Sequence, residues 1–270
     1  MTQIKNFVSK FDSTFNTINF DMSTKISIIT PTKNRAVFLP QIAACVLAQG
    51  VDWEWLILDD SDAPSRFLQD LSTNDARIQY FFSETPLTIG EKRNRLIAVA
   101  TGEVIAHFDD DDFYAPQYLS NMVSLLQQEQ ADMIKLSGFY LYAPNAHFFG
   151  YMDLNAKVGL HYELICDQVS TIEFHEKMQI GADFIVFYGF SYVYRKSVTQ
   201  DAFFDDVNLC DDEGFAKRVL NNGHKLITTN DATRDCLHII HPNSTARCFS
   251  KYAMPEFLVH DLFPLYKPSL

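Results

Sequence analysis

The first half of the chain alternates short apolar runs with longer amphipathic segments. Apolar runs at 25–30, 54–60, 77–82 and 103–108 are predicted to form buried strands. Amphipathic segments at 36–49, around 66–71 and at 89–100 are predicted to form helices, the first ended by Gly50 and the last by Gly102. This alternation is typical of βαβ units. It predicts a Rossmann-like α/β fold whose mostly parallel central sheet is flanked by helices.

Beyond residue 130 the regular alternation ends. A helix is predicted over 116–128, followed by strands with aromatic faces at 132–143, 147–154 and 185–196. A further helix over 211–223 is ended by Gly223. No internal repeat and no linker rich in Pro, Gly or Ser separates the two parts. We therefore expect a single domain over 1–270 with a mixed C-terminal half.

Both ends of the chain carry apolar residues at helical spacing. Ile4, Phe7, Phe11 and Phe15 fall near one side of a helix over 3–18. We expect an N-terminal helical extension over 1–24 that packs on the domain. A helix on a membrane surface is less favoured, because the polar face has few Lys or Arg residues. Segment 246–270 is predicted to be a C-terminal helical tail, or else an arm that contacts a partner.

Composition and charge narrow the class of partner. The chain has a net charge of -12, is 47% hydrophobic and contains 23 Phe and 12 Tyr, which indicates an ordered globular protein. An acidic net charge without a run of basic residues argues against nucleic acid as the partner. It also leaves the chain without a polybasic segment that could bind anionic lipid. The five cysteines are scattered without a C-x-x-C pair, which favours a reducing compartment. With neither a signal peptide nor a run of ~20 apolar residues, we expect a cytoplasmic protein.

Carboxylates gather where the predicted strands end. Asp59 and Asp60 end the second strand, and Asp109 to Asp112 follow the fourth. The carboxyl ends of parallel strands share one edge of a sheet, so these groups are expected to lie together, near Thr30. Four adjacent carboxylates repel one another and need compensation. Solvent could compensate these charges, with one Asp acting as a helix N-cap. The alternative is a bound divalent cation.

The ordered set of motifs resembles a known family. ISIITPTKNR, LILDDSD, GEKRNRLIAVATGEVIAHFDDDDFYAP and DDEGFAKRVLNNGHKL are similar to successive signatures of family 2 glycosyltransferases, which are inverting nucleotide-sugar enzymes of GT-A fold. The resemblance spans roughly 25–228 and is strongest between 25 and 120. It implies a nucleotide-binding half over 25–130 and an acceptor-binding half over 131–245.

The resemblance implies a role for several residues in binding the nucleotide sugar. Thr30 and Pro31 match the loop that contacts the nucleobase, and Asp60 matches the acceptor of a hydrogen bond from the base, commonly uracil. Arg93 matches a position near the base and the phosphates. Asp109, Asp110 and Asp111 overlay the D-x-D motif: its last Asp usually binds the metal, and the preceding ones help to hold the ribose and the metal.

The same resemblance places the catalytic base at Asp211 or Asp212. The family has Glu-Asp there, ahead of a helical Arg that matches Arg218, and the second residue of the pair is usually the base. Since this chain has Asp-Asp, both stay candidates. His238 and His241 come late in the chain, and either one could complete the metal shell, although a hydrogen-bonded structural histidine is the simpler interpretation of each alone.

Charge considerations agree with a metal cofactor. A nucleotide sugar carries an anionic diphosphate, which a rim of carboxylates would repel unless Mn²⁺ or Mg²⁺ bridged the two. We therefore expect Asp109, Asp111 and His238 to bind such a cation, which would also stabilise the leaving nucleoside diphosphate. A sugar-phosphate nucleotidyltransferase is less favoured, because TPTKNR stands where a Gly-rich phosphate loop would follow the first strand.

The expected function is metal-dependent transfer of a sugar, with inversion, from a nucleotide sugar to a hydroxyl of a glycan or lipid-linked acceptor. Surface polysaccharide or lipopolysaccharide biosynthesis is the expected setting, with possible peripheral association at the inner face of the membrane. UDP is the expected nucleotide, because Asp60 matches the family residue that accepts a hydrogen bond from the base, which is commonly uracil. The alternative is an inactive relative that binds a nucleotide or a glycan. Oligomeric state, donor sugar and linkage do not follow from the sequence.

Overall fold

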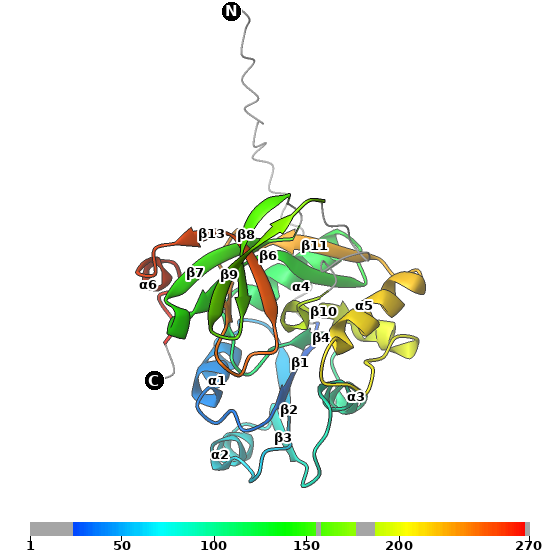
Figure 1. Cartoon of the computed structure of the whole chain (residues 1–270). Coiled ribbons are helices and arrows are strands. Elements are labelled where there is room, and N and C mark those ends of the chain that lie inside the picture. Colours follow the sequence, from blue (N-terminus) through cyan, green and yellow to red (C-terminus); the bar gives the residue numbers. More distant parts are fainter. Residues whose placement is uncertain (1–23, 155–157, 177–186, 268–270) are drawn as a thin grey trace, which may run out of the picture.

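The computed structural model describes residues 24–154, 158–176 and 187–267 (Figure 1). The helix expected over 3–18 lies outside these ranges. The helices are α1 (Leu39–Leu47), α2 (Arg66–Asn74), α3 (Ile89–Val99), α4 (Tyr118–Gln128), α5 (Asp211–Asn221) and α6 (Leu258–Leu262). The strands are β1 (Ile26–Thr32), β2 (Trp53–Asp59), β3 (Ile78–Phe82), β4 (Val104–His107), β5 (Phe113–Tyr114), β6 (Met133–Ala143), β7 (Phe148–Asp153), β8 (Gly159–Ile165), β9 (Gln168–Phe174), β10 (Val193–Arg195), β11 (Leu226–Asn230), β12 (Cys236–Ile239) and β13 (Arg247–Met254).

The N-terminal half confirms the predicted α/β architecture. Strands β3, β2, β1 and β4 lie side by side in that order, and every neighbouring pair is parallel. Strand β2 is buried along its whole length because α1 and α2 cover one face of the sheet and α3 and α5 the other (Figure 1). A strand buried on both faces reads as a continuous apolar run, which is the signal that the sequence carries.

The C-terminal half continues the same sheet with mixed directions. Strand β10 pairs antiparallel with both β4 and β6, and the long β6 also pairs in parallel with β11 and β12. Beyond β6 the strands β7, β13, β8 and β9 follow as an antiparallel layer, in the upper part of Figure 1. Within the described ranges, no helix has the length and apolar character that crossing a membrane requires.

Two predicted elements are wrong in type or extent. The segment 246–270 is not a helical tail, because Arg247–Met254 forms β13 between β7 and β8, and in the described residues 246–267 only Leu258–Leu262 is α-helical. Residues such as Cys248 and Ser250 are buried while Arg247 and Tyr252 are exposed, so a sheet position and not a helical face sets this pattern. In the described part, 187–196, of the strand expected over 185–196, Val193–Arg195 forms β10 while Gly189–Ser191 forms a 3₁₀ turn.

Candidate active site

The ends of β1, β2 and β4 form an acidic rim beside two cavities. The larger cavity, of about 720 Å³, is lined by residues that include Pro31, Thr32, Arg35, Lys92, Arg93, Asp109, Asp110, Asp111 and His238. The smaller cavity, of about 380 Å³, lies against Asp60, Ser61, Phe82 and Glu84. Lys33 and Pro86 line both cavities, so the two meet at these residues. The two cavities are therefore neighbours along the rim.

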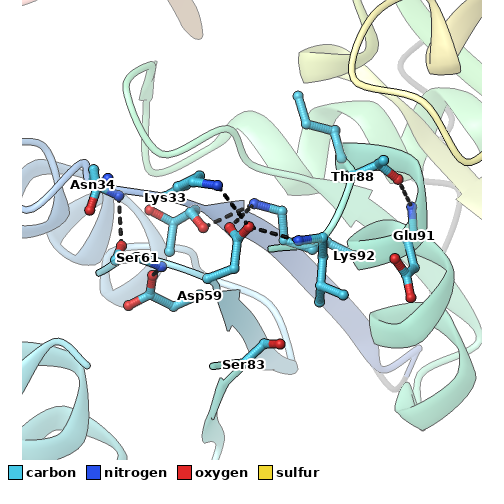
Figure 2. A network of polar contacts seen from close by, with 12 residues as sticks. Lys33, Asn34, Asp59, Ser61, Ser83, Thr88, Glu91 and Lys92 are labelled. Carbon is cyan, nitrogen blue, oxygen red and sulfur yellow. Dashed lines mark hydrogen bonds and ion pairs between the residues drawn. The ribbon is translucent and has the colours of Figure 1, made fainter. Parts of the chain in front are cut away.

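The carboxylate of Asp60 is enclosed by hydrogen-bond donors. Lys92 Nζ donates to Oδ1 at 2.7 Å, while the backbone N–H of Leu87 donates to Oδ2 at 2.9 Å. Lys33 Nζ reaches the same Oδ2 at 3.3 Å, and Figure 2 shows this network around Lys33 and Lys92. Burial raises the pKa of Asp60, but the contact with Lys92 and the other donors outweigh it, so the pKa lies below its ordinary value. Asp60 is therefore held as an anion.

Asp110 and Asp111 take different partners although they are adjacent. The hydroxyl of Thr32 donates to Asp110 Oδ2 at 2.5 Å. Arg35 donates to Asp111 Oδ2 at 2.8 Å, and His241 Nε2 lies 2.9 Å from the same oxygen. Burial raises the pKa of Asp110 well above its ordinary value, and the charge of Asp111 adds to this. Burial also acts on Asp111, but the hydrogen bond from His241 and the charge of Arg35 outweigh it and lower its pKa.

Asp112 forms an ion pair with His238. Nδ1 of His238 lies 3.0 Å from both carboxylate oxygens of Asp112, and the backbone N–H of Ile239 donates to Oδ1 at 2.8 Å. Burial lowers the pKa of His238, but the charge of Asp112 outweighs this and the pKa rises well above its ordinary value. The other ring nitrogen, Nε2, is buried and lacks a partner in hydrogen-bond geometry among the described residues, although the Cys248 thiol also acts on the ring and raises its pKa. A carboxylate on one ring nitrogen is the arrangement that orients a metal-binding histidine.

Arg93 joins the rim to helix α5. Its guanidinium forms an ion pair with Asp211 Oδ2, and its NH2 atom lies 3.6 Å from Asp109 Oδ1. Arg93 is buried, and the charges of Asp211 and Asp109 outweigh the effect of burial and raise its pKa. Burial raises the pKa of Asp109 to about 7, although Arg93 opposes this. Burial likewise raises the pKa of Asp211 against the same opposing charge.

Asp212 has a different environment from Asp211. Its Oδ2 accepts a hydrogen bond from the backbone N–H of Gly189 at 2.9 Å, and its Oδ1 accepts one from the N–H of Glu213 at 2.9 Å. Asp211 is buried in the ion pair with Arg93, whereas Asp212 is partly exposed. Neither side chain lines the larger cavity. The structure thus separates two adjacent carboxylates into one that is ion-paired and one that is held by backbone donors.

The larger cavity carries oxygen and nitrogen donors that a divalent cation could use. Within the described part of the chain, no three His, Cys, Asp or Glu side chains form a ready-made metal site. Asp109 Oδ1 and His238 Nε2 are nevertheless buried atoms without a hydrogen-bond partner there, and both residues line the larger cavity with Asp111. Mg²⁺ and Mn²⁺ are commonly held by one or two carboxylates together with substrate phosphates, so a closed protein cage is not required. The residues present fit such a cation.

Of the residues predicted to bind the nucleotide sugar or the metal, the structure brings all but Thr30 to the walls of the two cavities. Thr30 is fully buried: its hydroxyl donates to the carbonyl oxygen of Phe108 at 2.8 Å and accepts from the indole of Trp55 at 2.9 Å. It therefore lies inside the sheet and does not face a ligand. Arg93 lies on the wall of the larger cavity and not on that of the cavity beside Asp60.

Several residues that line the larger cavity were not predicted from the sequence, namely Thr32, Lys33, Arg35 and Lys92. All of them lie inside the motifs TPTKNR and GEKRNR, so their position beside the expected residues was the available signal. Arg218, which matches the helical Arg of the family, pairs with Asp205 and packs on Phe203.

Comparison with known proteins decides the family. The family model described as glycosyl transferase family 2 matches residues 27–201, which is more than half of the chain. The chain belongs to glycosyltransferase family 2. The expected family and the expected class of enzyme, a glycosyltransferase, are thereby confirmed.

Relatives of this glycosyltransferase include a Campylobacter jejuni protein named GalNAc(5)-diNAcBac-PP-undecaprenol beta-1,3-glucosyltransferase, 36% identical over 110 residues, or 39% of this chain. The match spans 34% of that protein's length, so the chain corresponds to about a third of this relative. A solved structure of Staphylococcus aureus TarS 1-349 with UDP-GlcNAc has a TM-score of 0.61 at 16% identity, covering 82% of this chain and 60% of that one.

A second solved structure is a mannosyltransferase from Pyrobaculum calidifontis in complex with GDP-Man and Mn²⁺. Its TM-score is 0.55 at 14% identity, and the alignment covers 80% of this chain and 56% of that one. At these identities both likenesses concern the fold alone. They agree with the GT-A architecture expected from the sequence.

Proposed function

We propose that this family 2 glycosyltransferase transfers a sugar, with inversion and with the help of Mn²⁺ or Mg²⁺, from a nucleotide sugar to an acceptor hydroxyl. The observation that carries the proposal is the pair of cavities that meet at Lys33 and Pro86. The nucleobase is assigned to the smaller cavity beside Asp60. The diphosphate and the sugar are assigned to the larger cavity, beside Asp109 and Asp111.

On the donor side, the chain supplies both charge and fixed geometry. Lys33, Lys92 and Arg35 place positive groups on the walls of the larger cavity, where an anionic diphosphate would bind. Asp109, Asp111 and His238 would hold the cation, and Asp110 the ribose. When bound, the cation stabilises negative charge on the leaving nucleoside diphosphate. Pro31 is assigned to the donor-binding wall of the larger cavity, which it lines, whereas Thr30 is too deeply buried to contact a ligand.

On the acceptor side, Asp212 is the better candidate for the catalytic base. Asp211 is buried and ion-paired with Arg93, so its carboxylate is already engaged. Asp212 accepts only backbone hydrogen bonds from Gly189 and Glu213 in the contacts that the structure gives, and a carboxylate has lone pairs beyond these. A partly exposed carboxylate can remove the proton of an acceptor hydroxyl as that oxygen attacks the sugar from the face opposite the diphosphate. Such a single displacement inverts the anomeric centre.

Donor and acceptor are assigned by class. UDP-sugars are proposed as donors because Asp60 is among the residues that line the smaller cavity and because the TarS structure contains UDP-GlcNAc. A lipid-linked saccharide is proposed as acceptor because the Campylobacter jejuni relative is named for an undecaprenol-linked one. The proposed setting is surface polysaccharide or lipopolysaccharide biosynthesis, with peripheral association at the cytoplasmic face of a membrane.

A donor panel tests the proposal. Release of nucleoside diphosphate is measured with UDP-glucose, UDP-galactose, UDP-N-acetylglucosamine, UDP-N-acetylgalactosamine, GDP-mannose and dTDP-rhamnose, each with MnCl₂ and each with chelator. We expect release from at least one UDP-sugar, with water as a slow acceptor, and loss of this release when the metal is chelated. If no donor of the panel released nucleoside diphosphate and none changed the melting temperature of the protein, the proposed transferase activity would be contradicted, and the alternative of a relative without turnover would be favoured.

A further inference from the structure

A buried turn links the two sides of the proposed site. It comprises Tyr188 to Ser191, immediately before β10, and is called the 188–191 turn. The backbone N–H of Gly189 donates to Asp212 Oδ2 at 2.9 Å. A Cβ atom placed on Gly189 would lie 2.9 Å from Cβ of Asp212 and 3.5 Å from both terminal nitrogens of Arg93. Only a glycine lets the backbone approach the carboxylate this closely.

The same turn contacts the acidic rim through Tyr114. The hydroxyl of Tyr114 accepts from the backbone N–H of Asp109 at 3.1 Å and donates to the carbonyl oxygen of Phe190 at 2.9 Å. The ring of Phe190 stacks on His238, with ring centroids 4.4 Å apart and planes 10° apart. One residue of the turn therefore touches the rim on the donor side, while its neighbour Gly189 touches Asp212.

The 188–191 turn is itself firmly held. The hydroxyl of Ser191 accepts from the backbone N–H of Leu136 on β6 at 3.1 Å and donates to the carbonyl oxygen of Tyr188 at 3.2 Å. The hydroxyl of Tyr118 on α4 donates to the carbonyl oxygen of Ser191 at 3.3 Å. All four turn residues are buried. A turn fixed from two elements can hold a functional group at a constant distance from its partners.

We propose that Gly189 is a positioning residue that fixes the carboxylate of Asp212 relative to the donor-binding rim. Its N–H orients the carboxylate, and its missing side chain leaves the space that Asp212 and Arg93 occupy. Tyr114 and Phe190 tie this arrangement to Asp109 and His238. The inference rests on the proposed function, in which Asp212 is the base.

Gly189→Ala tests the proposal, with Gly50→Ala as a matched control, because a Cβ on Gly50 meets nothing within 4 Å. The steric conflict at Gly189 displaces Asp212 but leaves the cavity walls in place. We expect kcat for nucleoside diphosphate release from the active panel donor to fall roughly ten- to hundredfold. The donor KM and the Kd for UDP with Mn²⁺ should stay within about twofold of the parent, and Gly50→Ala should match the parent in all three quantities.

Ser191→Ala is the second variant, because it removes the hydroxyl that holds the turn without adding an atom. Ser191→Ala should also lower kcat, but by a smaller factor than Gly189→Ala, and it should leave the Kd for UDP unchanged. A kcat within about twofold of the parent in a folded Gly189→Ala protein would overturn the inference, as would an equal loss of UDP affinity and turnover. Unchanged turnover in Asp212→Asn would overturn the proposed function itself. So would the absence of nucleoside diphosphate release by the parent protein with every donor of the panel.

Discussion

Asp212→Asn is expected to lower turnover about 10³-fold while leaving donor binding unchanged. General base catalysis contributes roughly 10²–10⁴-fold, and an amide cannot take the proton of the acceptor. The substitution preserves the shape of the side chain and an oxygen that can accept from the N–H of Gly189. The measurement is kcat and KM for nucleoside diphosphate release, with the Kd for UDP and Mn²⁺ by calorimetry.

Glu213→Gln is the control for this experiment. Glu213 is adjacent, and its carboxylate pairs with Lys217 on the same helix. Such an exposed pair contributes little, so the control should keep the turnover and stability of the parent. If Asp212→Asn retained more than about a tenth of the parental turnover and Asp211→Asn lost it with unchanged stability, the base would be Asp211.

Arg93→Met is expected to destabilise the protein by about 3–5 kcal/mol. Arg93 is buried between Asp211 and Asp109, and removing one partner of a buried ion pair leaves uncompensated carboxylates. In a protein of this size, that loss corresponds to a fall in melting temperature of roughly 10 °C. The measurement is thermal unfolding at neutral pH, together with denaturant unfolding.

Arg95→Met provides the comparison, two residues further along helix α3. Arg95 is exposed and pairs with Glu91 one turn earlier, a contact that contributes about 0.3–0.5 kcal/mol. Its removal should leave the melting temperature almost unchanged. Equal, small effects of the two substitutions would show that Asp211 and Asp109 do not depend on Arg93 for their charge balance.

The fold was predictable where burial leaves a simple pattern. Strands β1, β2 and β4 are mostly apolar and are buried along nearly their whole length, because helices cover both faces of the sheet. The hairpin of β8 and β9 was missed, because β9 is the last strand of the sheet and most of its residues are exposed. Without a buried face, such a strand leaves no hydrophobic alternation to detect. Strand β13 was not predictable either, because only part of its length is buried and its burial does not alternate regularly.

The site was predictable as a cluster but not as a set of partners. The run Asp109 to Asp112 marks the rim in the sequence, yet each carboxylate is compensated from a distant segment. Arg35 lies 76 residues from Asp111, and His238 lies 126 residues from Asp112. Local sequence does not encode such pairings. Thr30 was misplaced for a simpler reason: β1 continues to Thr32, and the first residue of this strand that lines the larger cavity is Pro31.

The central claim is that the acidic rim binds a nucleoside diphosphate through a divalent cation. Its most direct test is calorimetric titration of the protein with UDP in MnCl₂, in chelator, and in MnCl₂ with Asp111→Asn. The account predicts measurable binding only in the first case, with at least a tenfold loss of affinity in the other two. Equal UDP affinity with and without Mn²⁺, unaffected by Asp111→Asn, would contradict it.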